Sequence, residues 1–85
     1  MKESVLIVGV GNGLSASLAR LCKSKRMKIV LAARDIVKLK QLKEEVGAYT
    51  IKCDSTNIKS VANLFKKTDK IIGVPNLVIY NPSKS

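Results

Sequence analysis

One stretch near the N-terminus carries most of the structural information in this chain: Val5-Leu-Ile-Val-Gly-Val-Gly-Asn-Gly-Leu-Ser-Ala-Ser-Leu-Ala19. Its first residues form an apolar, partly β-branched run that is typical of a strand buried on both faces. Glycines at positions 9, 11 and 13 follow, and a helical pattern begins directly after them. A glycine backbone can approach a phosphate closely, and a helix N-terminus offers free N–H groups and the positive end of a dipole. Because the glycines lie between a strand and a helix, the stretch predicts a turn that binds the pyrophosphate of a dinucleotide.

Strand and helix patterns continue to alternate along the rest of the chain. Apolar runs predict strands at residues 4–9, 28–33, 48–53 and 76–81, and helical spacing predicts helices at residues 14–25, 36–46 and 60–68. Asp35 stands where a helix N-cap belongs, and Gly47 stands where a C-terminal cap glycine belongs. The order is βαβαβαβ, which predicts an α/β fold: a Rossmann-like, doubly wound parallel sheet with right-handed helical crossovers.

The periodicity also predicts which side chains face the core. We expect inward faces made of Leu14, Leu18, Leu21 and Cys22 in the first helix, Ile36, Leu39, Leu42 and Val46 in the second, and Val61, Leu64 and Phe65 in the third. In the third strand, alternation places Tyr49, Ile51 and Cys53 on one side. Cys22 and Cys53 are therefore expected to be small buried apolar side chains, because the chain has no histidine that could activate them as nucleophiles.

Length and composition bound the class of protein. With 85 residues, 46% of them hydrophobic and 26% charged, the chain has the balance of one small globular domain rather than of a disordered segment. No apolar run approaches the roughly 20 residues that span a bilayer, and the N-terminus has no signal-peptide pattern. Two distant cysteines without any histidine exclude the usual Cys/His zinc sites and favour a reducing compartment. We therefore expect a cytoplasmic protein without a metal site or a membrane partner.

The net charge of +10 at pH 7 raises the alternative of a nucleic-acid-binding protein. Most of the cations are lysines spread along the chain, and no aromatic residues alternate with them to stack on bases. Solvated helix faces explain this charge better, and part of it would steer a phosphate-bearing ligand. Nucleic acid is therefore the weaker interpretation.

The chain stops shortly after its fourth predicted strand. In a doubly wound sheet, a fourth strand beside the first needs cover for its outer edge and for its faces. We therefore expect residues 1–85 to be a dinucleotide-binding domain that is incomplete, the N-terminal fragment of a longer domain.

With these motifs, the chain resembles the N-terminal, cofactor-binding part of the short-chain dehydrogenase/reductase family over nearly all of its length. The family's glycine pattern, T-G-x-x-x-G-x-G, falls on residues 8–15, where Gly9 and Gly13 match, Val8 replaces the threonine and Ser15 replaces the third glycine. Residues 11–16 also read as G-x-G-x-x-A, so two registers of the motif stay open. In either register the resemblance implies that the pyrophosphate contacts come from Gly9, Gly11, Asn12, Gly13 and Leu14.

The end of the second predicted strand indicates which cofactor is preferred. An NAD-preferring site usually has a carboxylate here that binds the ribose 2′-hydroxyl, but this chain has Ala33 followed by Arg34. A guanidinium can pair with a 2′-phosphate, so the pattern favours NADP, with NAD as the alternative. Asp35 comes one residue later and is interpreted as a helix cap, with a ribose contact as its other candidate role.

Polar residues also follow the third and fourth predicted strands. Asp54 and Ser55 stand where the family has a strand-tip aspartate that meets the adenine ring. Capping of the following helix is the alternative role of Asp54, and the two roles can coexist. Asn81 matches the asparagine of the family's N-A-G segment, which borders the ribose, although Pro82 and Ser83 depart from that segment.

Tyr80 and Lys84 have the Y-x-x-x-K spacing of the family's catalytic pair. That chemistry needs both side chains on one helix face, so that the lysine lowers the pKa of the tyrosine. Tyr80 instead ends an apolar strand, and Pro82 disfavours a helix through the pair. We therefore assign no catalytic residue in this chain.

The resemblance implies reversible hydride transfer between a nicotinamide and a carbonyl or alcohol substrate, with the catalytic half absent from these residues. The expected partners are the dinucleotide, a small carbonyl or alcohol molecule in a longer form, and a second copy in a homo-oligomer of the full-length form. A nucleotide-binding module without catalysis is the alternative function.

Overall fold

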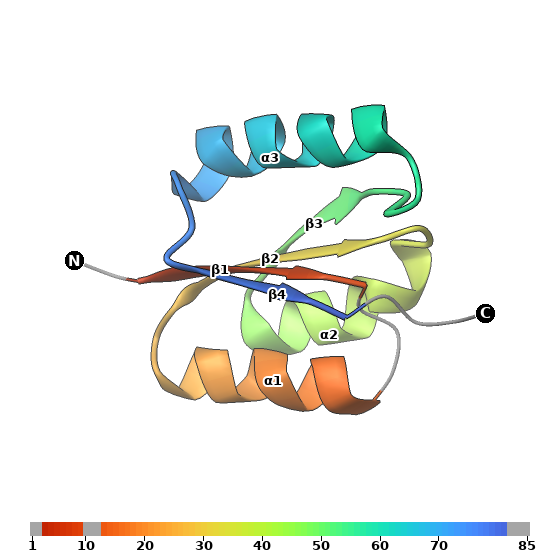
Figure 1. Ribbon diagram of the computed structural model, residues 1–85. Helices are drawn as coiled ribbons and strands as arrows, with labels where there is room; N and C mark the ends of the chain where they lie inside the picture. Colours follow the sequence, from red (N-terminus) through yellow and green to blue (C-terminus); the bar gives the residue numbers. More distant parts are fainter. Residues whose placement is uncertain (1–2, 10–12, 82–85) are drawn as a thin grey trace.

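Four parallel strands form a single sheet in the computed structural model, which describes residues 3–9 and 13–81 (Figure 1). The strands are β1 (Ser4–Val8), β2 (Lys28–Ala33), β3 (Tyr49–Lys52) and β4 (Leu77–Tyr80). Their order in the sheet is β3-β2-β1-β4, and every pairing is parallel. The predicted Rossmann-like α/β architecture with an incomplete sheet is confirmed.

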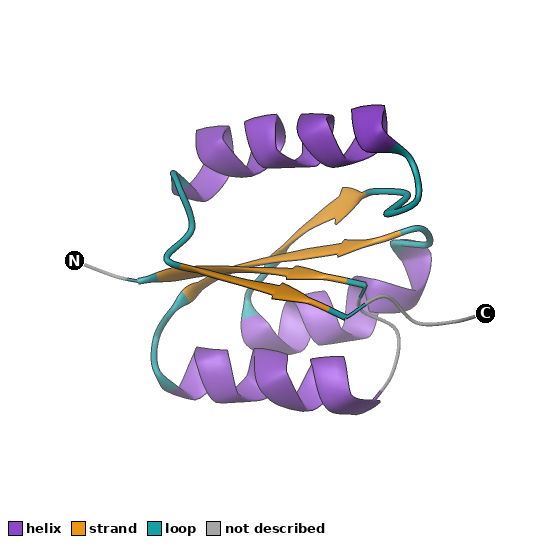
Figure 2. Cartoon of the chain, viewed as in Figure 1, coloured by secondary structure: helices purple, strands orange, loops and turns teal. Residues whose placement is uncertain are grey.

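Helices connect consecutive strands and cover both faces of the sheet. Helix α1 (Gly13–Ser24) follows β1, the short 3-10 helix η1 (Val37–Leu39) and α2 (Lys40–Val46) follow β2, and α3 (Ile58–Ile72) follows β3. Helices α1 and α2 lie on one face and α3 lies on the other (Figure 2). Because β2 and β3 lie on one side of β1 and β4 lies on the other, the direction of strand succession reverses between β1 and β4. In open α/β sheets, ligands bind at the carboxyl ends of the strands beside such a reversal.

The alternation of side chains along β1 divides the core into two layers. Val5 and Ile7 pack under α1 and α2, whereas Leu6 and Val8 pack under α3. All five residues of β1 and five of the six residues of β2 are buried, as expected for strands covered on both faces. The layer under α1 and α2 also contains Ala19, Cys22, Ile29, Leu31, Leu39 and Val46, and the layer under α3 also contains Val30, Ala32, Ile51, Cys53 and Leu64.

Gly47 caps α2 as predicted, and Asp35 bonds to the start of η1, although the residue at the N-cap position is Ile36. The Asp35 carboxylate accepts a hydrogen bond from the Val37 N–H at 3.1 Å, which satisfies a free donor at the start of η1. Gly47 ends α2 in the left-handed conformation, with φ of 65°. Asn57 caps α3 by accepting from the Ser60 N–H at 3.1 Å, so this helix begins earlier than the predicted residue 60 and continues beyond residue 68.

The inward face of α1 differs from the prediction. Ser15, Ala19 and Cys22 are the buried residues, whereas Leu14 and Leu21 are 62% and 52% exposed. Each of these two leucines precedes a buried residue by one position, which rotates it by about 100° around the helix axis. Because small side chains line the buried face, α1 can lie close to the sheet, and the leucines are turned away from it.

One further prediction of a core position, that of Phe65, was wrong. In α3 the buried residues are Leu64 and Thr68, whereas Phe65 is 42% exposed. Tyr49 lies at the amino end of the edge strand β3 and is exposed, unlike Ile51 and Cys53 on the same side of that strand. Phe65 follows the buried Leu64 by one position, which rotates it by about 100° around the helix axis, whereas Tyr49 is exposed at the end of its strand.

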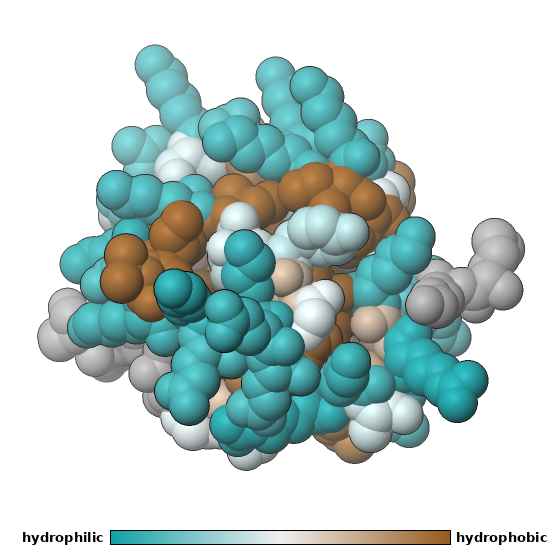
Figure 3. Space-filling model, turned by 180° about the vertical axis from the view of Figure 1, so that it is seen from behind, coloured by the Kyte–Doolittle hydropathy of each residue, from teal (hydrophilic) through white to brown (hydrophobic). Residues whose placement is uncertain are grey.

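The other edge strand, β4, is sparsely covered. Leu77, Val78 and Tyr80 are all exposed, and Ile79 is half-buried. On the face that Figure 3 shows, apolar side chains form a band across the upper half, with hydrophilic side chains above and below it. Within the described ranges, no helix is both long enough and apolar enough to cross a membrane.

Candidate functional site

Backbone hydrogen bonds align the carboxyl ends of the strands. The Gly9 N–H donates to the Ala32 carbonyl, the Cys53 N–H donates to the Ala33 carbonyl, and the Asn81 N–H donates to the Val8 carbonyl, each at 2.9 Å. These bonds extend the strand pairing by one residue beyond each assigned strand. Because the strands are parallel, the residues that follow β1, β2, β3 and β4 lie at the same end of the sheet.

The start of α1 forms one wall of this edge. Gly9 has a positive φ of 88°, a conformation that favours glycine. Gly13 is the first residue of α1, and a Cβ built on it would meet no heavy atom of another described segment within 4 Å. The first turn of α1 contains no acidic side chain that would neutralise the positive end of the helix dipole. The described segments therefore leave the backbone at the start of α1 uncovered beside Gly13.

The other two residues predicted in this turn, Gly11 and Asn12, lie outside the described residues. Leu14, which was also predicted to contact the cofactor, is the second residue of α1 and has an exposed side chain. A contact to a phosphate at the helix start would come from its backbone rather than from this side chain.

A contact that the sequence did not predict joins α1 to the end of β4. The Asn81 side chain donates from Nδ2 to the Ser15 Oγ at 3.2 Å, across 66 positions of the sequence. Ser15 is completely buried, so the serine that replaces the family's third glycine packs into the interior. The bond fixes the orientation of the Asn81 amide at the reversal between β1 and β4. The signal in the sequence was the hydroxyl of Ser15, which a glycine at this position would lack.

Arg34 follows β2 and is exposed. Among the described residues, the only ion pair joins Arg20 to Glu45, so Arg34 is not held by a carboxylate within 4 Å there. The neighbouring Asp35 directs one carboxylate oxygen to the start of η1. The end of β2 is thus followed by the exposed guanidinium of Arg34, while the carboxylate of Asp35 bonds to the start of η1.

Asp54 follows β3 and forms a polar turn. Its Oδ1 accepts from the Thr56 N–H at 3.0 Å and from the Thr56 hydroxyl at 2.7 Å. These two hydrogen bonds lower the pKa of the Asp54 carboxyl, and the positive charge of Arg34 lowers it further. Asp54 is therefore held ionised in the turn before α3, but the predicted alternative of capping that helix is wrong, because the N-cap of α3 is Asn57. Ser55, the other residue predicted here, is half-buried.

Of the remaining candidates, Tyr80, Cys22 and Cys53 lie where the sequence predicted. Tyr80 lies in β4 and not on a helix, and Lys84 lies outside the described residues. Cys22 and Cys53 are free and buried, and burial raises the pKa of the Cys22 thiol. In the described part of the chain, no three potential metal-ligating side chains of His, Cys, Asp or Glu come together.

The sequence and the fold of this chain are similar to those of known proteins. A protein-family model described as short chain dehydrogenase matches residues 3–83. A solved structure of an actinorhodin polyketide ketoreductase variant with NADPH is 18% identical, with a TM-score of 0.91 over 98% of this chain and 34% of that chain. A metagenomic short-chain oxidoreductase in complex with NADP is 23% identical, with a TM-score of 0.83 over 89% of this chain and 37% of that one.

A third similar structure carries the other dinucleotide. It is a protein from Haemophilus influenza, assigned as a D-mannonate oxidoreductase, with bound NAD. It is 15% identical, with a TM-score of 0.82 over 89% of this chain and 29% of that chain. The chain spans about a third of the length of these three structures, and at such identities the similarity establishes a shared fold.

Proposed function

The chain belongs to the short-chain dehydrogenase family, and on that premise we propose that it is the dinucleotide-binding part of an oxidoreductase that prefers NADP. The observation that carries the proposal is the open space beside Gly13 at the start of α1. Packing within the described chain does not require a glycine there, because a Cβ would meet nothing within 4 Å. A pyrophosphate that approaches the first turn of the helix does require it.

The preference for NADP rests on the end of β2. Arg34 is exposed, and its guanidinium can make paired hydrogen bonds to a 2′-phosphate. A carboxylate that binds a ribose 2′-hydroxyl would disfavour that phosphate, but Ala33 stands at the strand tip. The nearest acidic residue in sequence, Asp35, uses an oxygen to accept the Val37 N–H, so it stabilises the helix start instead.

Three other residues complete the proposed site. Asp54 and Ser55, after β3, would border the adenine ring, with Asp54 held in place by its bonds to Thr56. Asn81, after β4, would border the ribose, with its amide oriented by Ser15. The bound nicotinamide would supply the chemistry, a reversible hydride transfer with a carbonyl or alcohol substrate. The residues of this chain bind and orient the cofactor, and we assign no catalytic group among them.

The experiment is a side-by-side titration of the protein with NADPH and NADH, followed by the fluorescence of the reduced nicotinamide. The chain contains no tryptophan, so protein fluorescence interferes little. We expect NADPH to bind more tightly. Arg34→Ala should weaken NADPH binding about ten-fold, because a hydrogen bond to a charged group contributes about 1.5 kcal/mol, and should leave NADH binding unchanged.

The matched control is Lys38→Ala, which removes an exposed cation from η1 beside the same strand end. Lys38→Ala should weaken the binding of NADPH and of NADH only slightly, because it lowers the overall positive charge without removing a direct contact. Equal weakening by Arg34→Ala and Lys38→Ala would contradict the 2′-phosphate contact, and tighter binding of NADH would contradict the preference for NADP. Failure of both dinucleotides to bind would overturn the proposed function as a whole.

A further inference from the structure

Asn81 bonds to the chain on both sides of the glycine-rich segment. Its backbone N–H donates to the carbonyl of Val8, the last residue of β1, at 2.9 Å. Its side-chain Nδ2 donates to the Oγ of Ser15, the third residue of α1, at 3.2 Å. One residue after β4 therefore joins the end of β1 to the first turn of α1.

The Ser15 hydroxyl lies inside the protein rather than on the surface of the proposed cofactor site. The residue is completely buried, so its side chain does not itself contact a bound molecule. Burial of a hydroxyl costs free energy unless a hydrogen bond compensates it. The Asn81 amide supplies such a bond to Ser15, and the glycine of the family pattern has no side chain that could form it.

This bond restricts the first turn of α1 in a way that the apolar contacts of the helix do not. Ala19 and Cys22 hold α1 against the sheet through contacts that have no preferred direction. A hydrogen bond is directional, so the bond from Asn81 restricts the first turn relative to the ends of β1 and β4. The free N–H groups of that turn bind an anion only when they point at it from hydrogen-bond distance. The orientation of the turn therefore affects the affinity for a pyrophosphate.

We propose that Ser15 is a positioning residue for dinucleotide binding, which acts through Asn81 on the first turn of α1. The inference rests on the proposed function. It adds that a buried hydroxyl, in place of the family's third glycine, strengthens the binding of the pyrophosphate without touching it. Loss of this hydroxyl should therefore affect a ligand that has a pyrophosphate more than a ligand that has none.

The test compares two ligands on Ser15→Ala, which removes the hydroxyl and keeps a small side chain. NADPH should bind about five-fold more weakly, as expected for the loss of one hydrogen bond. Adenosine 2′-monophosphate has the 2′-phosphate but no pyrophosphate, and its affinity, measured from backbone amide chemical shifts, should stay within about two-fold of the wild-type value. The midpoint of urea unfolding should change little, because alanine has a higher helix propensity than serine, which offsets the lost bond.

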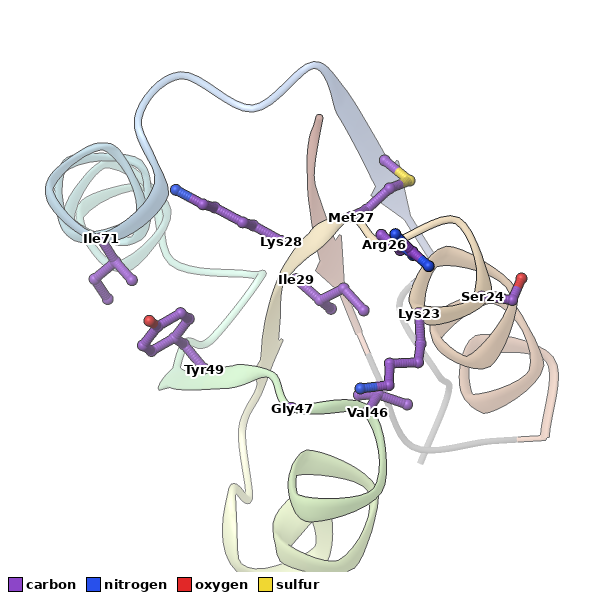
Figure 4. A pocket seen from close by; sticks show the side chains of 10 residues that line it. All are labelled: Lys23, Ser24, Arg26, Met27, Lys28, Ile29, Val46, Gly47, Tyr49 and Ile71. Carbon is purple, nitrogen blue, oxygen red and sulfur yellow. The ribbon is translucent and has the colours of Figure 1, made fainter. Parts of the chain in front are cut away.

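The opposite edge of the sheet, where the strands begin, provides a matched control. A groove of about 570 Å³ lies there, but Figure 4 shows Lys28 extending toward α3 and Arg26 lying beside α1, so these cations do not converge and we assign the groove no ligand. Ser4 begins β1 at this edge and is buried, and its Oγ donates to the Oδ1 of Asn76, which precedes β4, at 3.4 Å. Ser4→Ala removes a serine–asparagine bond of the same kind, so it should lower the midpoint of urea unfolding and leave NADPH binding unchanged.

A double-mutant cycle tests whether Ser15 acts through Asn81. Asn81→Ala removes the side-chain amide and keeps the backbone N–H that donates to Val8. Because both substitutions remove the same bond, the double variant should bind NADPH no more weakly than Asn81→Ala alone.

The outcomes separate this inference from the proposed function. Wild-type affinity for NADPH in Ser15→Ala, equal weakening of NADPH and adenosine 2′-monophosphate, equal effects of Ser15→Ala and Ser4→Ala, or additive effects in the cycle would each overturn the inference alone. Failure of the wild-type protein to bind either dinucleotide would overturn the proposed function, and the inference with it.

Discussion

Adding one methyl group at Gly13 should move stability and cofactor binding in opposite directions. Gly13 is the first residue of α1, and a Cβ built there meets no heavy atom of another described segment within 4 Å. Gly13→Ala therefore introduces no clash with those segments. Alanine is favoured over glycine by about 1 kcal/mol in a helix interior, and we expect about half of that at the first residue.

The size of the stability gain can be stated as a shift in Tm. For a domain of this length, about 0.5 kcal/mol corresponds to a rise of about 2–4 °C. The binding loss has a different origin, because the added methyl occupies the space through which a pyrophosphate would reach the first turn of α1. We expect NADPH binding to weaken at least about ten-fold, which corresponds to about 1.4 kcal/mol.

Two assays measure these effects on the same samples. Urea unfolding followed by far-UV circular dichroism gives the stability, with an unchanged m-value as the check that the variant unfolds as the wild type does. Titration with NADPH gives the affinity. Gly73→Ala is the matched control, because Gly73 also has open space around it but a positive φ of 79°, at the end of α3.

Gly73→Ala should show the reverse pattern. An alanine forced into that backbone conformation should cost about 1–2 kcal/mol of stability, while NADPH binding stays at the wild-type value. The reasoning about Gly13 is refuted if Gly13→Ala binds NADPH as tightly as the wild type, since the pyrophosphate then does not approach this residue. A loss of stability in Gly13→Ala would show instead that the space beside the residue is not open.

Two further predictions concern the fold itself. The Thr68 hydroxyl is buried without a hydrogen-bond partner in the described part of the chain. Thr68→Val keeps the shape of the side chain and removes the hydroxyl, so it should raise the free energy of unfolding in urea by about 1 kcal/mol. A lower free energy of unfolding would mean that the hydroxyl has a partner. The hydrogen-bonded Arg20 guanidinium lowers the pKa of Glu45 below its usual value of 4.5, so the bond stabilises the fold above that pH and the benefit is lost as the pH falls toward the lowered pKa. The stability difference between wild type and Glu45→Gln should therefore shrink below about pH 4.5 in acid unfolding, and a difference that is constant with pH would contradict this.

The order of elements could be predicted from the sequence because it depends on neighbouring residues. Apolar runs, glycines and polar residues at helix ends act within a few positions of themselves: Gly47 caps α2 as predicted, and Asp35 bonds to the start of η1. The convergence of Gly9, Arg34, Asp54 and Asn81 at one edge was predictable as well, because the carboxyl ends of parallel strands meet there.

The prediction of the buried face of α1 was wrong because burial there depends on how closely the helix packs against the sheet. The leucines of α1 gave the stronger apolar stripe, but Ser15, Ala19 and Cys22 form the buried face. Both stripes have helical spacing, so periodicity alone could not choose between them. The sheet accepts the smaller side chains because they allow a closer approach of the helix.

The sequence by itself determined the alternating α/β order, the glycine turn before α1 and the cation after β2, since each depends on local conformational preference or on residue identity. Only the tertiary structure decided that Ser15 bonds to Asn81, that Arg26 takes the left-handed conformation, and that Lys28, Tyr49 and Ile71 line one groove. These features join residues far apart in the chain or depend on how one helix ends against its neighbours. Strand register and helix packing determine these features, and many residues contribute a little to each. No short sequence motif therefore predicts them.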